Sequence, residues 1–394
     1  MSPLAGLTVL DLSRVLAGPY CTMTLGDLGA RVLKIEEPGK GDDTRRWGPP
    51  FWRGESAYFL AVNRNKESLT LDLKHEPGRA ILTRLVERAD VLVENFRPGT
   101  LERLGFGYEA CRAVNPRLVY ASVSGYGTTG PEASRAGYDL IAQGEGGVMS
   151  LTGEPDGEPM KAGVSQADIV AGLWALQGIL VALYDRERTG QGQRVDTSLL
   201  EGQIGLLTYH ASNYWATGTA PERLGNRHPN LTPYGTFRAR DGWVTVGAGN
   251  DVQFTKLCAA LGGPALADRP EYATNEARLT HRASLEAALA PLFVALDAAD
   301  VLDRLRAAGV PAGRVLSVPE ALDTPQVRAR AMVVELAHPT IPDFRTTGLP
   351  VKLSRTPGHP RTAPPLLGEH TESILAELGY DAEAIAQLRA GGTV

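Results

Sequence analysis

Short apolar runs and helical patterns alternate through the first half of this chain. The runs at 7–12, 31–36, 91–95 and 118–124 are apolar enough for buried strands, and 68–73 alternates apolar with polar residues. Between them, 20–28 and 78–87 carry apolar residues at helical spacing. This rhythm predicts an α/β fold with a parallel, doubly wound sheet. Loops after the strands of such a sheet share one crevice where ligands usually bind. Here those loops comprise 13–19, Lys74, 95–97 and 125–127.

A longer apolar run follows, from Ile169 to Tyr184, with Gln177 as its only strongly polar member. The run is too short and too interrupted to span a membrane. It therefore predicts a buried core helix.

The pattern changes after this helix. A strand is expected after the turn at 190–196, and an aromatic-rich helix from 199 to about 218. Arg240-Asp-Gly242 separates two strand-like runs, which is a hairpin signal. Amphipathic helices are expected near 252–262, 284–295 and 298–308. We therefore predict a large domain at 1–225, a smaller α+β domain at 226–325, and a segment, 326–394, that returns to the large domain.

Asp168 stands at the start of the apolar helix, in Lys161-Ala-Gly-Val-Ser-Gln-Ala-Asp168. A carboxylate at this position meets helix N–H groups and an apolar interior, which suits a nucleophile. The same residues also fit a capping box, with Ser165 as N-cap and Asp168 three residues later. The residues alone leave both interpretations open.

The composition excludes several classes of partner. The net charge is −5 and the pI is about 5.9, so no global basic field exists for nucleic acid or an anionic membrane. The three cysteines are far apart and show no metal-ligand spacing, so neither a metal site nor a disulfide framework is expected. The N-terminus carries no signal-peptide pattern. The expected location is the cytoplasm.

The glycine pattern and the histidines give only weak support to other activities. Gly125-Tyr-Gly-Thr-Thr-Gly130 matches the dinucleotide-binding glycine pattern, but Pro131 follows at once and no helix is expected to begin there. A ligand-facing turn is the better interpretation. The seven histidines have no partner motif of a serine hydrolase.

Many segments together resemble family III CoA-transferases, over essentially the whole chain. They are Val9-Leu-Asp-Leu-Ser-Arg-Val-Leu-Ala-Gly-Pro19, Gly41-Asp-Asp-Thr-Arg, Val62-Asn-Arg-Asn-Lys66, Val93-Glu-Asn-Phe-Arg-Pro-Gly, Gly125-Tyr-Gly-x-x-Gly-Pro, Ala136-Gly-Tyr-Asp139, the Asp168 segment, Thr189-Gly-x-Gly-Gln-x-Val-Asp-x-Ser-Leu and Leu367-Gly-x-His-Thr371. Asn63-Arg-Asn-Lys, Ser212-Asn-Tyr and Gly247-Ala-Gly-Asn are most similar to members that use succinyl-CoA and glutarate.

The resemblance implies a Rossmann-like large domain, a small domain and an interlocked homodimer. It implies that Asp168 is the catalytic residue, forming aspartyl anhydride and aspartyl-CoA thioester intermediates. CoA and acyl-CoA are then substrates, a carboxylic acid is the acceptor, and no cofactor is tightly bound. Gly247, Ala248 and Gly249 resemble a glycine loop that covers the site from the partner subunit. Without the resemblance, a plain strand-to-helix turn with Asn250 or Asp251 as N-cap is the simpler interpretation of that loop.

Several positions match the family's contacts with CoA: Val15, Ala17, Leu71, Lys74, Asn95, Phe96 and Arg103. Lys74 and Arg103 suit phosphate groups, and Phe96 and Leu71 can flank adenine. Glu37, however, stands where the family has an arginine for the nucleotide phosphate, and Lys34, Lys40 and Arg46 are candidates to replace it.

The acyl pocket is expected to include Leu16 and Tyr138. Leu16 replaces a glutamine found in formyl-CoA transferases, which argues against formyl or oxalyl substrates. Tyr138 matches a tyrosine near the acyl intermediate. Arg14, Arg46 and Tyr138 are candidates to recognise a second carboxylate, and they therefore favour dicarboxylic acids.

Two alternatives remain at this point. The superfamily includes α-methylacyl-CoA racemases, which carry histidine where this chain has Tyr138, and a tyrosine with a pKa near 10 is a poor base at neutral pH. A non-enzymatic CoA-binding protein would not need Asp168.

Overall fold

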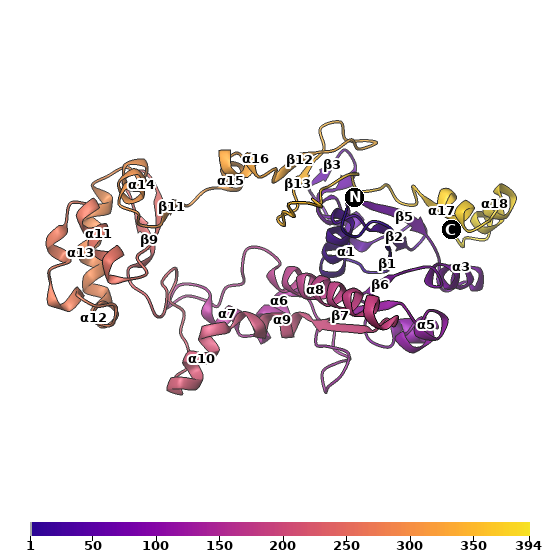
Figure 1. Cartoon of the computed structure of the whole chain (residues 1–394), viewed down its shortest axis with the longest axis horizontal. Coiled ribbons are helices and arrows are strands. Elements are labelled where there is room, and N and C mark those ends of the chain that lie inside the picture. Colours follow the sequence, from indigo (N-terminus) through magenta and orange to yellow (C-terminus); the bar gives the residue numbers. More distant parts are fainter. Residues whose placement is uncertain (1) are drawn as a thin grey trace. The chain divides into compact units, whose positions relative to one another are not determined.

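The computed structural model describes residues 2–394 and divides into two compact units (Figure 1). Unit 1 comprises 1–149, 161–219 and 325–394, and unit 2 comprises 150–160 and 220–324. We describe each unit by itself. The domain limits expected from the sequence, 1–225, 226–325 and 326–394, stay predictions.

Unit 1 is built on a six-stranded sheet in which every neighbouring pair is parallel. In spatial order its strands are β5 (Lys66–Thr70), β2 (Arg31–Glu36), β1 (Thr8–Asp11), β6 (Val91–Glu94), β7 (Val119–Ser124) and β8 (Arg194–Ser198). Counted along the chain, this is the order 3-2-1-4-5-6 of doubly wound nucleotide-binding folds. The predicted α/β class and parallel sheet are confirmed.

Alternate residues of the strands enter two separate cores, one on each face of the sheet. Val9, Val32 and Val91 pack with α1 (Ala17–Asp27) and α8 (Gln166–Thr189) on one face. Leu10 and Leu33 pack on the other face. The helices of that face are α3 (Glu76–Val86), α5 (Tyr108–Val114), α17 (Thr371–Glu377) and α18 (Ala382–Ala390). Strands covered on both faces must be apolar throughout, which is why their sequences are continuous apolar runs.

Helix α8 is the one helix in residues 2–394 with the length and composition to cross a membrane. It is a core helix, because Ala171, Ala175 and Ile179 are fully buried against α1 and the sheet. The prediction is therefore confirmed for that face. The opposite face exposes Trp174 and Val181 in the isolated chain, as well as Leu173 and Tyr184.

The structure corrects two element boundaries. Strand β5 begins at Lys66 and ends at Thr70, so the expected strand at 68–73 was placed too late. The helix expected at 199–218 is two helices, α9 (Leu199–Leu206) and α10 (Thr208–Thr217), which meet where Thr208 adopts a positive φ of 38°.

The motif Asn63-Arg-Asn-Lys66 lies in the interior and stabilises the sheet. Arg64 pairs with the buried carboxylate of Asp27 at 2.7 Å, and the amide of Asn65 donates to the same carboxylate at 2.7 Å. Lys66 donates to Asp11 at the end of β1 at 2.8 Å, and both side chains are fully buried. Each buried charge therefore has an opposite charge beside it, as burial requires.

The C-terminal segment covers the free edge of β5. The N–H of His370 donates to the carbonyl of Ser68 at 3.0 Å, and the N–H of Thr70 donates to the hydroxyl of Thr371 at 3.1 Å. The side chain of Asn65 accepts from the N–H of Thr362 at 2.9 Å. A segment about 300 residues away in sequence therefore pairs the edge strand.

The remaining elements of unit 1 are short. They are the 3₁₀ helix Asp43–Arg46, β3 (Phe51–Trp52), β4 (Glu55–Ser56), α2 (Ala57–Val62), α4 (Thr100–Arg103), α6 (Asp139–Glu145), α16 (Pro325–Ala329), β12 (Val333–Glu335) and β13 (Arg345–Thr347). Helix α7 (Val148–Leu151) lies where the chain passes to unit 2.

Unit 2 has its own core between an antiparallel sheet and helices. The hairpin expected around 240–242 is confirmed, because β9 (Tyr234–Arg238) pairs antiparallel with β10 (Trp243–Gly247), which also pairs with β11 (Ala312–Arg314). The three expected helices are present as α11 (Asp251–Ala260), α13 (Arg282–Val294) and α14 (Ala298–Ala307). Its other helical elements are α12 (Asn275–Thr280), α15 (Val318–Leu322) and the 3₁₀ turns Pro264–Leu266 and Pro270–Tyr272.

Candidate active site

The carboxyl ends of β1 and β6 form the switch point of the sheet, where the chain order reverses. The loops after these strands bond to each other through one side chain. Asn95 accepts from the N–H of Arg14 at 2.8 Å and donates to the carbonyl of Arg14 at 2.6 Å. A crevice at this point is the usual ligand site of an open α/β sheet.

A cavity of about 180 Å³ opens at the switch point and contains Asp168. The predicted residues Val15, Ala17, Asn95, Phe96 and Tyr138 line it together with Asp168. Other residues of its wall are Arg14, Asp43, Arg97, Gly125, Arg135 and Leu199. Sequence segments separated by more than 150 residues thus meet at one cavity, and they bring the predicted nucleophile together with five other predicted residues.

The turn between β1 and α1 is strained at the cavity wall. Val15 has a φ of 69°, which is rare for a β-branched residue. Its N–H donates to Asp42 at 3.3 Å, and Asp42 accepts in turn from the buried amine of Lys34 at 2.9 Å. Such strain persists only where the surroundings hold it, and it occurs mostly at functional sites.

Two glycines bring Tyr138 to the cavity. A Cβ on Gly137 would lie 2.4 Å from the Cα of Gly125, so the two backbones cross without room for any side chain. The glycine-rich segment that begins at Gly125 therefore serves as a crossing point after β7. No helix begins at Gly130, since the next helix, α6, begins at Asp139. This geometry agrees with a ligand-facing turn and not with a dinucleotide fingerprint.

Asp168 lies in the first turn of α8, and within residues 2–394 its carboxylate makes no hydrogen bond or ion pair. The capping-box interpretation is wrong, because the Ser165 side chain makes no capping hydrogen bond. Burial, and then the negative charge of Asp139, raise the pKa of Asp168 to about 7. The negative charge of this carboxylate is therefore poorly stabilised, as we expect for a nucleophile.

A second cavity of about 150 Å³ adjoins the first and shares two residues with it, Arg14 and Phe96. The Arg14 guanidinium lies over the Phe96 ring, 5.0 Å from its centroid. The predicted residues Leu71 and Lys74 line this second cavity. The arrangement suits a long ligand with a planar end, because an apolar wall and a cation lie side by side.

Glu37 lies in the wall of the second cavity, and its carboxylate forms ion pairs with two lysines. It accepts from Lys40 at 2.8 Å and lies 3.5 Å from the amine of Lys74. Lys34 is fully buried and paired with Asp42, so it does not supply the missing phosphate contact. Arg46 lies 3.8 Å from Asp43 and lines neither cavity.

Three other predictions fall outside these two cavities. Leu16 is buried in an apolar cluster with Met23 and Val62. Arg103 is exposed in α4, next to Leu104 of the second cavity. Gly247, Ala248 and Gly249 belong to unit 2, at the end of β10 and in the turn before α11, where Asn250 caps the helix by accepting from the N–H of Gln253 at 2.9 Å.

Sequence reasoning gave no role to Asp139 or Tyr58, and both lie beside Asp168. Asp139 accepts from the N–H of Ala167 at 2.8 Å. Burial, followed by the charge of Asp168, raises the pKa of Tyr58 to about 12. No local sequence pattern marks either residue, because the contact of Asp139 with the Ala167 N–H spans 28 residues.

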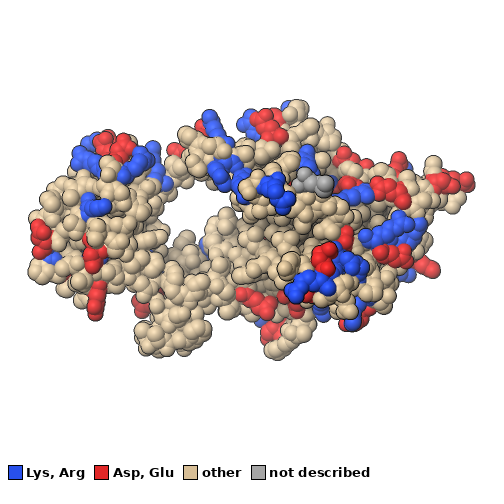
Figure 2. Space-filling view, in the orientation of Figure 1, with Lys and Arg blue, Asp and Glu red and all other residues tan. Residues whose placement is uncertain are grey.

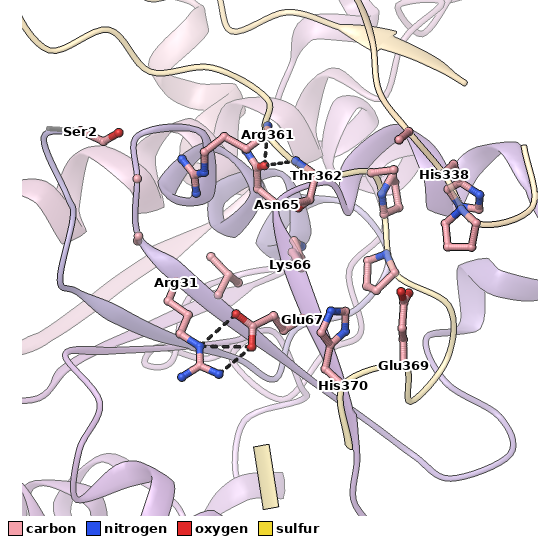
Figure 3. A pocket seen from close by; sticks show the side chains of 18 residues that line it. Ser2, Arg31, Asn65, Lys66, Glu67, His338, Arg361, Thr362, Glu369 and His370 are labelled. Atoms are coloured by element: carbon pink, nitrogen blue, oxygen red, sulfur yellow. Dashed lines mark hydrogen bonds and ion pairs between the residues drawn. The ribbon is translucent and has the colours of Figure 1, made fainter. Parts of the chain in front are cut away.

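A larger cavity of unit 1, about 880 Å³, lies elsewhere (Figure 3). It opens at the amino ends of β2 and β5, whereas Asp168 lies at the carboxyl end of the sheet. Arg31 and Glu67 in its wall are joined at 2.7 Å, so their charges neutralise each other. None of the predicted site residues lines it.

Within residues 2–394, no group of three or more His, Cys, Asp and Glu side chains is arranged to hold a metal ion.

Comparison with known proteins gives consistent matches. The profile described as CoA-transferase family III matches residues 4–371. A succinate–glutarate CoA-transferase of Agrobacterium fabrum is 45% identical over 95% of this chain and 96% of its own length. An acetyl-CoA:oxalate CoA-transferase of Acetobacter aceti is also 45% identical, over 95% of each chain. A solved structure described as a CAIB/BAIF family protein from Brucella suis has a TM-score of 0.86 and 45% identity, covering 96% of this chain and 99% of that chain.

Proposed function

Because this chain belongs to CoA-transferase family III, we propose that it moves CoA from succinyl-CoA to a dicarboxylic acid through covalent intermediates on Asp168. The observation that carries the proposal is the state of Asp168, an unpaired carboxylate with a raised pKa in the cavity at the switch point. CoA esters are the substrates of the family, and the reaction needs no further cofactor.

The proposed reaction conserves the thioester bond in four exchanges. An oxygen of Asp168 attacks the carbonyl carbon of succinyl-CoA, which forms a mixed anhydride and releases CoA thiolate. The thiolate attacks the aspartyl carbonyl, which forms an aspartyl-CoA thioester and releases succinate. A carboxylate oxygen of the acceptor attacks that thioester, which gives a second anhydride and thiolate. The thiolate then takes the acceptor's acyl group, and the Asp168 carboxylate is restored.

Water must be excluded while the anhydrides exist, since hydrolysis would lose the thioester energy. We assign this role to Gly247, Ala248 and Gly249 of the partner subunit in an interlocked homodimer. The exposed apolar side chains of α8 support a dimer, because a patch of this kind usually marks a protein interface. Helix α10 adds a surface without any Asp, Glu, Lys or Arg (Figure 2).

The two adjoining cavities supply a path for CoA. We propose that the planar and phosphate-bearing end occupies the cavity of Leu71, Lys74 and Phe96, with Arg103 nearby, and that the thioester lies between Val15, Ala17 and Asn95. Phe96 and Arg14 line both cavities and so contact the middle of the ligand. The reaction takes place in the cytoplasm.

A dicarboxylate acceptor is favoured by cations at the Asp168 cavity. Arg97 lines it, as do Arg14 and Arg135, which pair with Asp43 and Glu145, and the hydroxyl-bearing Tyr138. A second carboxylate would find charge-assisted donors there. Equal identity to relatives named for glutarate and for oxalate leaves the choice of acid to experiment.

Trapping tests the reaction class. The protein is mixed with succinyl-CoA, treated with hydroxylamine or borohydride, and mapped by mass spectrometry. We expect a modification on Asp168 that disappears when glutarate is added before the trap, and none in Asp168→Asn. Absence of any adduct, together with exchange of α-protons in a branched acyl-CoA, would instead establish a racemase.

An acceptor panel tests the substrate class. We expect kcat/KM for glutarate to exceed that for acetate and butyrate by about tenfold or more, since one buried charge-assisted hydrogen bond contributes about 1.5–3 kcal/mol. Arg14→Gln should reduce this preference. Equal activity with monocarboxylates would remove the dicarboxylate assignment and leave the transferase intact.

A further inference from the structure

The N-terminus of α8 is capped by a residue from another helix. Ser165 occupies the N-cap position without a capping hydrogen bond. Asp139, 28 residues earlier at the start of α6, accepts from the N–H of Ala167 at 2.8 Å. A carboxylate is the strongest acceptor for this position. The backbone N–H of Ala167, the residue before Asp168, is therefore already hydrogen-bonded.

The second oxygen of Asp139 continues the network. It accepts from the side-chain amide of Gln143 at 2.8 Å, and the carbonyl oxygen of that amide accepts from the N–H of Ala162 at 2.9 Å. Gln143 is fully buried. Two side chains of α6 thus fix both ends of the segment 162–167, which leads directly into Asp168.

In this network the carboxylate of Asp139 is hydrogen-bonded, whereas the carboxylate of Asp168 is unpaired. A carboxylate in the first turn of a helix would ordinarily be stabilised by free N–H groups and by the helix dipole. Asp139 uses the Ala167 N–H instead, and its own charge lies close enough to oppose the ionisation of Asp168. Reactivity of a carboxylate oxygen falls as hydrogen bonds stabilise its charge, so the network keeps Asp168 reactive.

We propose that Asp139, supported by Gln143, is a positioning residue for the reaction at Asp168: it fixes the segment that leads to the nucleophile and withholds a helix N–H from its carboxylate. This role rests on the proposed function. Asp139 does not line the Asp168 cavity, so it acts through Asp168 and not on the substrate.

Other charged and titratable groups lie near Asp168, and from α1 these include Tyr20, which packs in the same cluster as Tyr58 and Ile169. Those in the cavity wall are Arg14, which pairs with Asp43, Arg135, which pairs with Glu145, and Arg97 and Tyr138. From α2, Tyr58 faces Asp168 with its pKa raised, so it stays neutral near pH 7. Of these groups, Asp139 is the one whose charge raises the pKa of Asp168, after burial.

Asp139→Asn tests the proposal with a matched double variant, Asp139→Asn with Gln143→Glu. The single variant removes the negative charge at position 139. It also places the side-chain NH2 group of the introduced asparagine opposite the NH2 group of Gln143, so that this hydrogen bond is lost. The double variant allows an amide at 139 to donate to a carboxylate at 143, which still accepts from the Ala162 N–H. Hydrogen bonding and net charge are then retained, while the negative charge moves away from the helix N-terminus.

The readouts are the pH profile of kcat/KM for the acyl-CoA donor and the rate at which the Asp168 adduct forms. In Asp139→Asn we expect adduct formation to slow by about tenfold or more. We also expect the acidic limb of the profile to move to lower pH, because loss of a neighbouring negative charge stabilises ionised Asp168. The double variant should fold as stably as the wild type and still shift the limb. It therefore carries the test if the single variant fails to fold.

A merely structural role would lower the melting temperature of Asp139→Asn without moving the limb in either variant, and that result would overturn the proposal. An unchanged adduct rate with an unchanged limb would overturn it as well. Both outcomes differ from failure of the proposed function, in which wild-type protein itself forms no adduct on Asp168.

Discussion

At the scale of single residues, Asp11 at the end of strand β1 is fully buried and Asp168 at the start of helix α8 is partly buried, and a charged partner determines how burial changes the pKa of each. Burial alone would raise the pKa of Asp11, but Lys66 and Lys34 lower it to about 2. Asp168 has no such partner, so burial and Asp139 raise its pKa to about 7. The first carboxylate stabilises the fold as an anion, whereas the second is held as an anion at a cost to the fold.

We predict that Asp168→Asn abolishes turnover and stabilises the protein at alkaline pH. The pKa of Asp168 rises from 3.8 to about 7 on folding, so its ionisation opposes folding. The cost is absent below pH 3.8, grows up to pH 7 and stays constant above it. The variant should gain up to about 4 kcal/mol at pH 8, at ~1.36 kcal/mol per pKa unit.

Urea unfolding at pH 5 and pH 8 measures this gain. Glu187→Gln, an exposed position on the same helix, should show no comparable difference between the two pH values. A variant equally stable to wild type at pH 8 would contradict the raised pKa.

A second prediction concerns Glu37, which holds Lys40 and Lys74 at the cavity proposed for the phosphate-bearing end of CoA. Glu37→Gln frees both amines for the polyanionic ligand. The KM for acyl-CoA should fall by about two- to fivefold at low salt, since exposed charge pairs contribute up to about 1 kcal/mol. The gain should shrink at high salt while kcat stays constant.

Initial-rate kinetics at two salt concentrations check this. Glu109→Gln, whose partner Arg112 lines neither cavity, serves as the control. A KM that rises or stays constant in Glu37→Gln would show that the lysines do not meet the ligand.

At the scale of elements, the site depends on where loops cross. The turn after β1, the end of β6 and the crossing of Gly125 with Gly137 bring Val15, Asn95 and Tyr138 to one cavity. The first turn of helix α8 brings Asp168 to the same cavity. At the crossing, the two backbones lie too close for any side chain between them, and this contact positions Tyr138.

Gly137→Ala tests the crossing. The added methyl would overlap the backbone of Gly125, so strands and loop must move apart. We expect a loss of about 1–3 kcal/mol in stability and a fall in kcat, because Tyr138 moves with its neighbour. Gly205→Ala in helix α9, where a Cβ meets nothing within 4 Å, is the matched control. Thermal unfolding and activity of the two variants should diverge, and equal behaviour would disprove the role of the crossing.

The sequence predicts elements well where one physical rule decides them. Strands buried on both faces must be apolar, so β2 at Arg31–Glu36 was located by its residues. Strand β5 was placed too late because Lys66 resembles a surface residue until its partner Asp11 is known. The break at Thr208 carries no glycine or proline to mark it. The role of Asp139 depends on a contact across 28 residues, which local patterns do not contain.

At the scale of the whole molecule, exposed apolar side chains of α8 indicate an incomplete surface. Trp174 and Val181 are 48% and 60% exposed on the face opposite the core. Single exposed apolar residues are common, but a contiguous group of this kind usually contacts another chain. The proposed homodimer gives this face a partner.

Trp174→Lys should therefore convert the protein from dimer to monomer, because a charge in an apolar interface lacks a partner. Analytical ultracentrifugation over a range of concentrations measures the change. Glu187→Lys alters the charge of the same helix without touching the apolar face and should remain dimeric. Wild-type protein that sediments as a monomer would rule out the dimer and with it the role of the partner's glycine loop.

The pairing of β5 with the C-terminal segment has a consequence for synthesis of the protein. Strand β5 leaves the ribosome about 300 residues before the segment that covers its edge. At about 5–20 residues per second, that interval is roughly 15–60 s. For all that time the nascent sheet exposes an unpaired edge that another nascent chain can join. Premature termination before residue 361 would make this exposure permanent, so truncated products of this gene should be recovered as aggregates rather than as smaller folded proteins.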